Sequence, residues 1–407
     1  MAPIPWYRCV SRDAWHALFA AQAGWMLDAL DFVIYLMAIP TLQQVFGFDT
    51  GTAGLLATVA LLTSAAGGIL FGWLADRIGR RRALTLTILV YSLASLGSAT
   101  AATLAAFMAW RALLGFGMGG EWSAGAALVS ETWPAEHRGK AVGIMQSGWA
   151  LGYILAASLA VLLLPTLGWR WLFAAGVLPA LLTLWIRRHV REPAVWTARR
   201  GSGGLRLLLA PGYRGRTAVA IAMSSAVMFA YWGLFTWVPS FLASPVEKGG
   251  AGLGLVKSLA FIVPTQLGAF AGYLSFGFVS DRLGRRPAFV AFLAAAAVVV
   301  PVYGLGARSP ALLLALGPLL GFAGHGYFSL FGAQLAELFP TSIRATAQGL
   351  VYNSGRAVSA LAPYVIGALA RTRGIGPALA LTSGFFVLGA VFVLLLPETR
   401  GRALDEP

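Results

Sequence analysis

Long apolar runs recur along almost the whole of this 407-residue chain, and only short polar connections separate them. Most of the runs reach the roughly 20 residues that a helix needs to cross about 30 Å of hydrocarbon. The runs predict twelve spans, at approximately 13–40, 51–76, 82–100, 103–130, 138–163, 170–189, 215–243, 253–281, 287–307, 310–338, 343–370 and 374–396. The predicted fold class is therefore an all-α integral membrane protein.

The composition and the placement of charge agree with a membrane protein. Hydrophobic residues make up 58% of the chain and charged residues 11%, whereas soluble domains carry about 25% charged residues. The net charge of +15 does not indicate a nucleic-acid partner, because the basic residues gather in alternate connections such as 77–82 and 282–286. By the positive-inside rule these connections and both termini are cytoplasmic. We expect a multi-pass protein of the cell inner membrane.

The chain repeats itself at about half its length. Three motifs recur 205 or 206 positions later. Gly72 and Asp76 recur as Gly277 and Asp281, and Glu192 recurs as Glu398. Glu131, Pro134 and Arg138 recur as Glu337, Pro340 and Arg344. Such repeats predict two pseudo-symmetric six-helix bundles related by an axis along the membrane normal. We expect an N-terminal bundle at 1–189, a cytoplasmic linker at 190–214 and a C-terminal bundle at 215–407.

The paired loops GWLADRIGRRR and GFVSDRLGRR, together with RALLGFGMGGEW and PETRG, resemble the major facilitator superfamily across essentially the whole chain. The segment DALD in the first span, with Arg111, Glu131, Arg344 and Arg356, is similar to the proton symporters of organic acids, especially the aromatic-acid and sialate or metabolite branches. The resemblance implies alternating access by rocking of the two halves. It also implies that spans one, four, seven and ten line the cavity.

Ionisable side chains inside the first and fourth spans are candidates for proton coupling. Asp28 and Asp31 lie three residues apart on one helix face, and two carboxylates in a low-dielectric cavity cannot both stay ionised cheaply. Arg111 lies at a depth similar to that of Asp31, which permits a buried ion pair between them. Glu121 is a second candidate proton station, and a purely structural pairing role stays open for each of these groups.

A polar stripe in the eleventh span is the candidate substrate site. Arg356 lies near mid-depth without a counterpart in the first half, and its planar guanidinium suits a carboxylate. The full set of candidate substrate residues is Arg356, Asn353, Tyr352, His325, Gln146, Tyr231, Trp232 and Gln266. The alternatives are a structural cation for Arg356, a packing histidine for His325, and membrane-interface anchoring for the aromatic residues.

The repeated charges at the cytoplasmic side are predicted to form gating latches between the halves. They are Asp76, Arg80, Glu131, Arg138, Asp281, Arg285, Glu337 and Arg344. Plain positive-inside anchoring would explain the arginines but not the recurring acids.

We therefore expect a secondary active transporter that carries a small organic anion, a mono- or aromatic carboxylate, in symport with protons. Three alternatives stay open: a neutral sugar or polyol porter, a drug exporter and a sensor without transport. An enzyme is not expected, because the four histidines fall in unrelated places. The expected protein is a monomer in the lipid bilayer with protons as coupling ion and no cofactor or metal.

Overall fold

The computed structural model describes residues 6–48, 50–198, 205–243, 245–253, 255–306 and 309–402, and these residues form helices and no strand. The predicted linker therefore lies partly outside the described residues. The helices of the first half are α1 (Arg12–Phe46), α2 (Thr50–Ile78), α3 (Arg80–Thr100), α4 (Leu104–Thr132), α5 (Arg138–Leu163), α6 (Trp169–Ala174), α7 (Pro179–His189) and α8 (Ala194–Ala198). Those of the second half are α9 (Arg214–Phe235), α10 (Val238–Ala243), α11 (Leu255–Leu283), α12 (Arg285–Pro301), α13 (Pro310–Gly326), α14 (Phe328–Leu338), α15 (Arg344–Ser359), α16 (Ala362–Arg373), α17 (Ile375–Ala380) and α18 (Thr382–Leu394).

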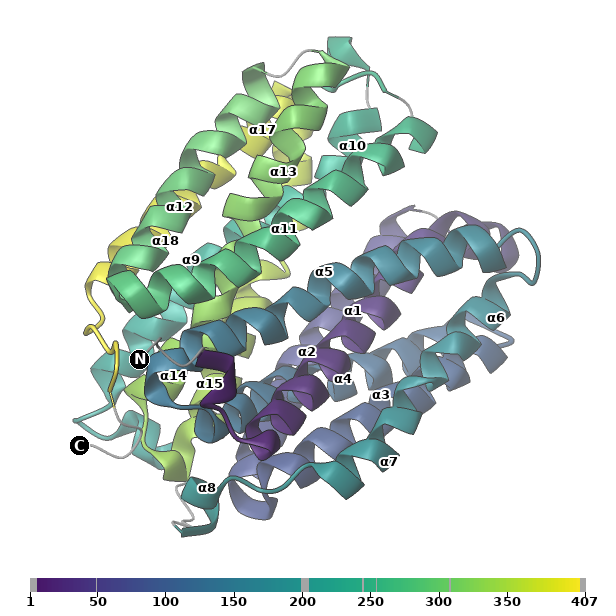
Figure 1. Ribbon diagram of the computed structural model, residues 1–407. Helices are drawn as coiled ribbons and strands as arrows, with labels where there is room; N and C mark the ends of the chain where they lie inside the picture. Colours follow the sequence, from purple (N-terminus) through teal and green to yellow (C-terminus); the bar gives the residue numbers. More distant parts are fainter. Residues whose placement is uncertain are drawn as a thin grey trace.

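The helices gather into two bundles that meet at one end of the molecule and diverge toward the other (Figure 1). Trp6 and the carbonyl group of Arg402 both contact the beginning of α5, so both ends of the described chain lie where the bundles meet. We call this the terminal end. Helices α1 to α5 pack together in the first bundle, and α9, α11, α12, α13, α15 and α18 pack together in the second.

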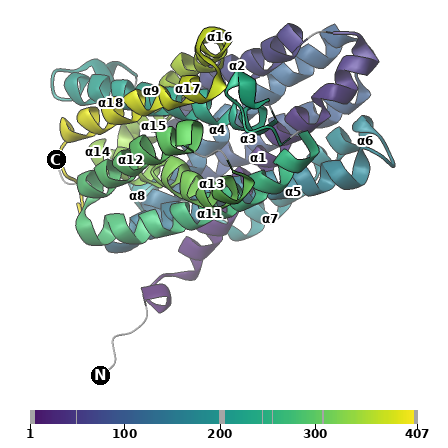
Figure 2. The ribbon, with the colours of Figure 1, turned by 90° about the horizontal axis from the view of Figure 1, so that it is seen from above.

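Two helix pairs carry most of the contact between the bundles: α5 against α11, and α2 against α15. Figure 2 shows α11 beside α5. Glycines allow the backbones to approach closely, because a Cβ on Gly143 would lie 2.6 Å from the carbonyl oxygen of Tyr273, and one on Gly72 the same distance from that of Ala345. The close contacts fix the relative position of the bundles near the terminal end.

Ten of the predicted spans are long and apolar enough in the described residues to cross a membrane. The two remaining spans correspond to α4 and to the pair α15 and α16. Both contain buried ionisable side chains, Arg111 and Glu121 in α4 and Arg356 in α15, which lower their hydropathy. Both of these spans carry candidate site residues.

Several predicted spans are interrupted rather than continuous. The seventh span is divided between α9 and α10, where Pro239 lacks the N–H that would continue the helix. The tenth is divided between α13 and α14, next to His325, whose Nδ1 lies 3.1 Å from the carbonyl oxygen of Gly321 one turn earlier. The eleventh is divided between α15 and α16, where Pro363 stands in the first turn of α16.

Candidate functional site

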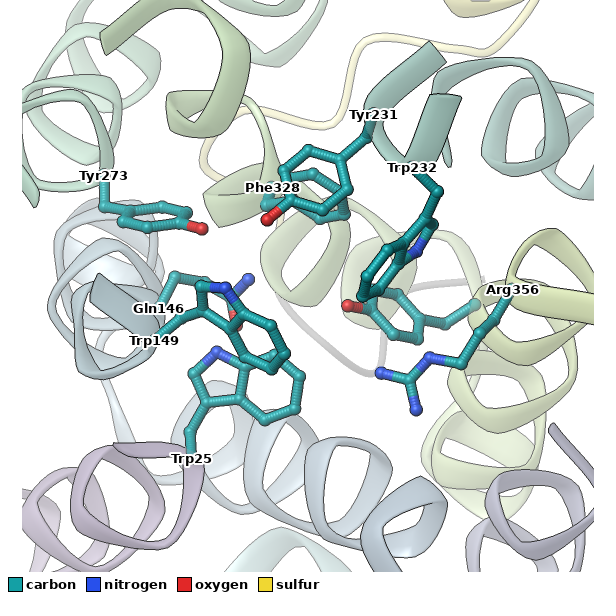
Figure 3. A pocket seen from close by; sticks show the side chains of 9 residues that line it. Trp25, Gln146, Trp149, Tyr231, Trp232, Tyr273, Phe328 and Arg356 are labelled. Carbon is teal, nitrogen blue, oxygen red and sulfur yellow. The ribbon is translucent and has the colours of Figure 1, made fainter. Parts of the chain in front are cut away.

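A small cavity lies between the two bundles, and aromatic rings make up most of its wall (Figure 3). It is lined by Trp25 of α1, Gln146 and Trp149 of α5, Tyr231 and Trp232 of α9, Tyr273 of α11, Phe328 of α14, and Tyr352 and Arg356 of α15. Five of these nine are predicted substrate residues. A second space adjoins the first, since Trp149, Trp232 and Arg356 line both.

Arg356 is the one charged side chain among the residues that line the cavity. It is 4% exposed, its Nη1 donates a hydrogen bond to Ser64 Oγ on α2, and its guanidinium lies 5.2 Å from the ring of Tyr352. The ion pairs of the described chain do not include it. A buried cation with this surrounding favours an anionic ligand.

Beside Arg356, a stack of two rings joins the bundles. Trp122 of α4 lies parallel to Tyr352 of α15, with 3.7 Å between the ring centroids. Trp122 Nε1 also donates a hydrogen bond to Gln146 Oε1 at 2.9 Å. Trp122 therefore contacts cavity residues from both halves.

Three predicted substrate residues do not line the cavity. His325 is buried among the rings of Tyr231, Phe235 and Tyr273, where it packs behind the wall. Asn353 points toward α2, where it contacts Gly68, and its amide donates to the carbonyl oxygen of Gly349. Gln266 is buried on α11 and is not among the lining residues. The helical register explains this outcome, because neighbours in sequence face different directions.

The resemblance suggested that spans one, four, seven and ten line the cavity, and the structure differs from that expectation. Spans one, five, seven, eight, ten and eleven supply the lining residues, and α4 contributes only Met118, in the adjoining space. Trp25, Tyr273 and Phe328 also line the cavity, although the sequence did not predict them there. Nothing separates them in sequence from the many other aromatic residues of the spans.

The predicted proton-coupling residues are buried in the first bundle, but Asp31 and Arg111 do not form the ion pair that their similar depth permits. Asp31 Oδ1 accepts a hydrogen bond from Ser95 at 2.8 Å, and Arg111 Nη1 donates to the backbone oxygen of Asp31 at 3.4 Å. The guanidinium of Arg111 lies over the ring of Tyr35 at 4.9 Å. Arg111 does reach the backbone of Asp31, but the carboxylate of Asp31 and the guanidinium of Arg111 contact different side chains.

Asp28 and Glu121 are fully buried, and no described group donates a hydrogen bond to either carboxylate. Both lie within electrostatic reach of Arg356. Two acids of the first bundle thus share one cation of the second. Asp28, Glu121 and Arg356 thus form a buried charge cluster. Because net charge is costly inside the membrane, the charges of these three groups must be close to balance.

At the terminal end, the eight predicted gating residues come together in two matching sets. Glu131 binds Arg80 of its own half at 2.8 Å and Arg344 of the other half at 2.7 Å. Glu337 binds Arg285 of its own half at 2.9 Å and Arg138 of the other half at 2.8 Å. Four buried ion pairs thus follow the internal repeat, and two of them cross between the halves.

The two aspartates of the repeat also reach across. Asp76 accepts hydrogen bonds from the backbone N–H groups of Ala345 and Thr346, at the beginning of α15. Asp281 accepts from those of Gly139 and Lys140, at the beginning of α5. Each carboxylate satisfies free N–H groups at the N-terminus of a helix in the opposite half, where the helix dipole favours negative charge.

Glu192 and Glu398 hold contacts within their own halves. Glu192 accepts hydrogen bonds from the backbone of Arg80 and Arg81. Burial raises the pKa of Glu398, but backbone N–H donors outweigh the burial and hold that pKa below the ordinary value of 4.5. The donors are Arg285, Arg286, Arg400 and Thr399.

Sequence comparisons identify the family. The family model of the Major Facilitator Superfamily matches residues 23–275 and 251–406. The chain belongs to the Major Facilitator Superfamily. It is 36% identical over 410 residues to a probable 4-methylmuconolactone transporter of Cupriavidus pinatubonensis, covering 98% of this chain and 94% of that protein. It is 30% identical over 397 residues to a cis,cis-muconate transport protein of Acinetobacter baylyi, covering 95% of this chain and 93% of that protein.

A solved structure supports the same fold. The proton:xylose symporter XylE superposes with a TM-score of 0.79 at 18% identity, covering 96% of this chain and 98% of that one. This superfamily member is therefore a multi-pass membrane transporter, and the two bacterial relatives are named for the transport of a muconolactone and of cis,cis-muconate.

Proposed function

We propose that this transporter carries a small organic anion, a mono- or aromatic carboxylate, in symport with protons, and that Arg356 binds the carboxylate. The observation that carries the proposal is the position of Arg356, a buried cation in an aromatic cavity between the two halves. A guanidinium offers two parallel hydrogen bonds to a carboxylate, and flat rings suit a flat apolar body.

Proton coupling follows from the charge balance of the buried cluster. Asp28 and Glu121 lie within electrostatic reach of Arg356 and have no hydrogen-bond partner in the described chain. A bound carboxylate adds a negative charge to a region that tolerates net charge poorly. A proton on Asp28, Glu121 or Asp31 restores the balance, so that the substrate and the proton bind best together.

Alternating access uses the charges at the terminal end. The ion pairs of Glu131 with Arg344 and of Glu337 with Arg138 hold the halves together there, and they must separate when the terminal end opens. By the positive-inside rule this end faces the cytoplasm of a cell inner membrane. Symport down an inward proton gradient then imports the acid, and the protein acts as a monomer with protons as the coupling ion and no cofactor.

The test is a ligand-binding measurement on the purified protein. Wild type should be stabilised against heat by carboxylates and not by neutral sugars, since a ligand stabilises the folded state by mass action. Arg356→Lys keeps the charge but loses the planar fork, so it should weaken acid binding roughly tenfold or more, about 1.4 kcal/mol. Unchanged acid binding by Arg356→Lys and by Arg356→Ala would overturn the proposal.

A further inference from the structure

The cavity has a second polar side, opposite Arg356, that consists of neutral N–H donors. Figure 3 shows Trp25, Gln146 and Trp149 on the side of the cavity away from Arg356. Trp25 is 2% exposed, and no acceptor in the described part of the chain receives the hydrogen of its Nε1. A buried donor without a partner is costly and therefore points to a ligand that supplies the acceptor.

Trp122 fixes the orientation of the Gln146 amide. The indole nitrogen of tryptophan can only donate, so the atom of Gln146 that receives its hydrogen, 2.9 Å away, must be the amide oxygen. The NH2 group is then left for other partners. Figure 3 shows the amide nitrogen directed into the cavity, toward the hydroxyl groups of Tyr231 and Tyr273.

We infer that Trp25 Nε1 and Gln146 Nε2 form a second subsite that binds a neutral hydrogen-bond acceptor on the substrate, such as a carbonyl, lactone or ring-nitrogen atom. The inference rests on the proposed function, in which the carboxylate of the same substrate binds Arg356. A second carboxylate is disfavoured at this subsite, because none of the side chains on that side of the cavity is a cation. The substrate class is thus a monocarboxylate with a neutral acceptor at its other end.

Trp25, Gln146 and Trp122 have different roles in this subsite. Trp25 and Gln146 touch the substrate, whereas Trp122 is a positioning residue that acts through Gln146. Trp122→Phe keeps a ring to stack on Tyr352 but loses the N–H that holds the amide. Gln146 can then turn and present its oxygen instead, so that a ligand with a donor becomes acceptable.

The experiment compares matched acids near neutral pH by calorimetric titration of the full-length protein. Benzoate has no second polar atom, pyridine-3-carboxylate and pyridine-4-carboxylate have a ring acceptor, and pyrrole-3-carboxylate has a ring donor. We expect wild type to bind at least one pyridine acid more tightly than benzoate, by roughly three- to tenfold for one neutral hydrogen bond. Trp25→Phe and Gln146→Leu should each reduce that preference, by weakening the binding of the pyridine acid more than that of benzoate. Trp122→Phe should reduce it too and improve binding of the pyrrole acid.

Three results would overturn the inference. Equal affinity of wild type for benzoate and both pyridine acids would remove the subsite while the proposed function stands. Equal weakening of all acids by Trp25→Phe and Gln146→Leu would assign both residues to packing. If no acid binds wild type, the proposed function and the subsite fail together. Arg356→Lys serves as the control, since it should weaken every acid by a similar factor.

Discussion

Glu131 offers the sharpest test of how the terminal end is held closed. Its carboxylate binds Arg80 within its own half and Arg344 across the interface, both with almost no exposure to solvent. Only the contact with Arg344 is lost when the halves separate. A hydrogen bond to a charged group contributes about 1.5–3 kcal/mol, which corresponds to a roughly ten- to 150-fold change in an equilibrium.

The variant Glu131→Gln keeps one acceptor oxygen, so we expect the lower end of that range, a roughly tenfold shift toward the form open at the terminal end. Spin labels on cysteines at the exposed positions Arg82 and Arg282, one in each half, would report the shift as a larger population of long distances. The background is Cys9→Ser, because Cys9 is the single cysteine of the chain.

The internal repeat provides matched controls. Glu337→Gln removes the equivalent contact with Arg138 and should produce a similar shift. Glu192→Gln removes contacts that stay within one half, with the backbone of Arg80 and Arg81, and should leave the distances unchanged. An unchanged distribution for both Glu131→Gln and Glu337→Gln would refute the role of these pairs as latches.

Three further predictions concern the rest of the molecule. A cysteine at Arg206 should react with an impermeant reagent only after the cells are opened, and labelling in intact cells would contradict the cytoplasmic position of the linker. The pKa of Glu398 lies below the ordinary 4.5 in the folded protein, so the ionised Glu398 side chain stabilises the folded state. This contribution is present above pH 4.5 and is lost as the pH falls through the lower pKa of the folded protein. The melting temperatures of wild type and Glu398→Gln should therefore differ near neutral pH and converge in acid, and a difference that persists at low pH would argue against this account. Gly143→Leu should hold α5 away from α11 and reduce transport, since even a Cβ at this position would lie 2.6 Å from the carbonyl oxygen of Tyr273. Transport by this variant at the wild-type rate would contradict the need for close approach of the two helices.

Much of the architecture can be predicted from the sequence, because the lipid bilayer requires long apolar segments and the internal repeat places equivalent residues in both halves. Apolar runs of spanning length predict the helices, and the offset of 205 or 206 brings Glu131 and Glu337 into equivalent ion-pair networks. The breaks in the seventh and eleventh spans occur near prolines. Arg356 is conspicuous in sequence because a lone guanidinium at mid-depth is costly.

The cavity wall is less predictable because it depends on the direction in which each side chain points. Tyr352 and Asn353 are adjacent in sequence, yet one lines the cavity and the other faces α2. Trp25 carries no polar signal that separates it from the other tryptophans. The pairing of Asp31 with Ser95 rather than Arg111 depends on rotamers, which hydropathy and spacing do not specify.

The most direct test of proton-coupled transport is substrate uptake into proteoliposomes with and without an inward proton gradient, beside counterflow at equal pH. Wild type should concentrate the acid in response to the gradient. Asp28→Asn and Asp31→Asn each fix a neutral side chain that mimics protonation, so the variant that replaces the proton carrier should still exchange bound substrate but no longer accumulate it. If both variants accumulate the acid as wild type does, neither aspartate carries the proton, and Glu121→Gln becomes the decisive variant. If wild type itself exchanges the acid but never accumulates it under the gradient, the transporter is not proton-coupled and the central claim is wrong.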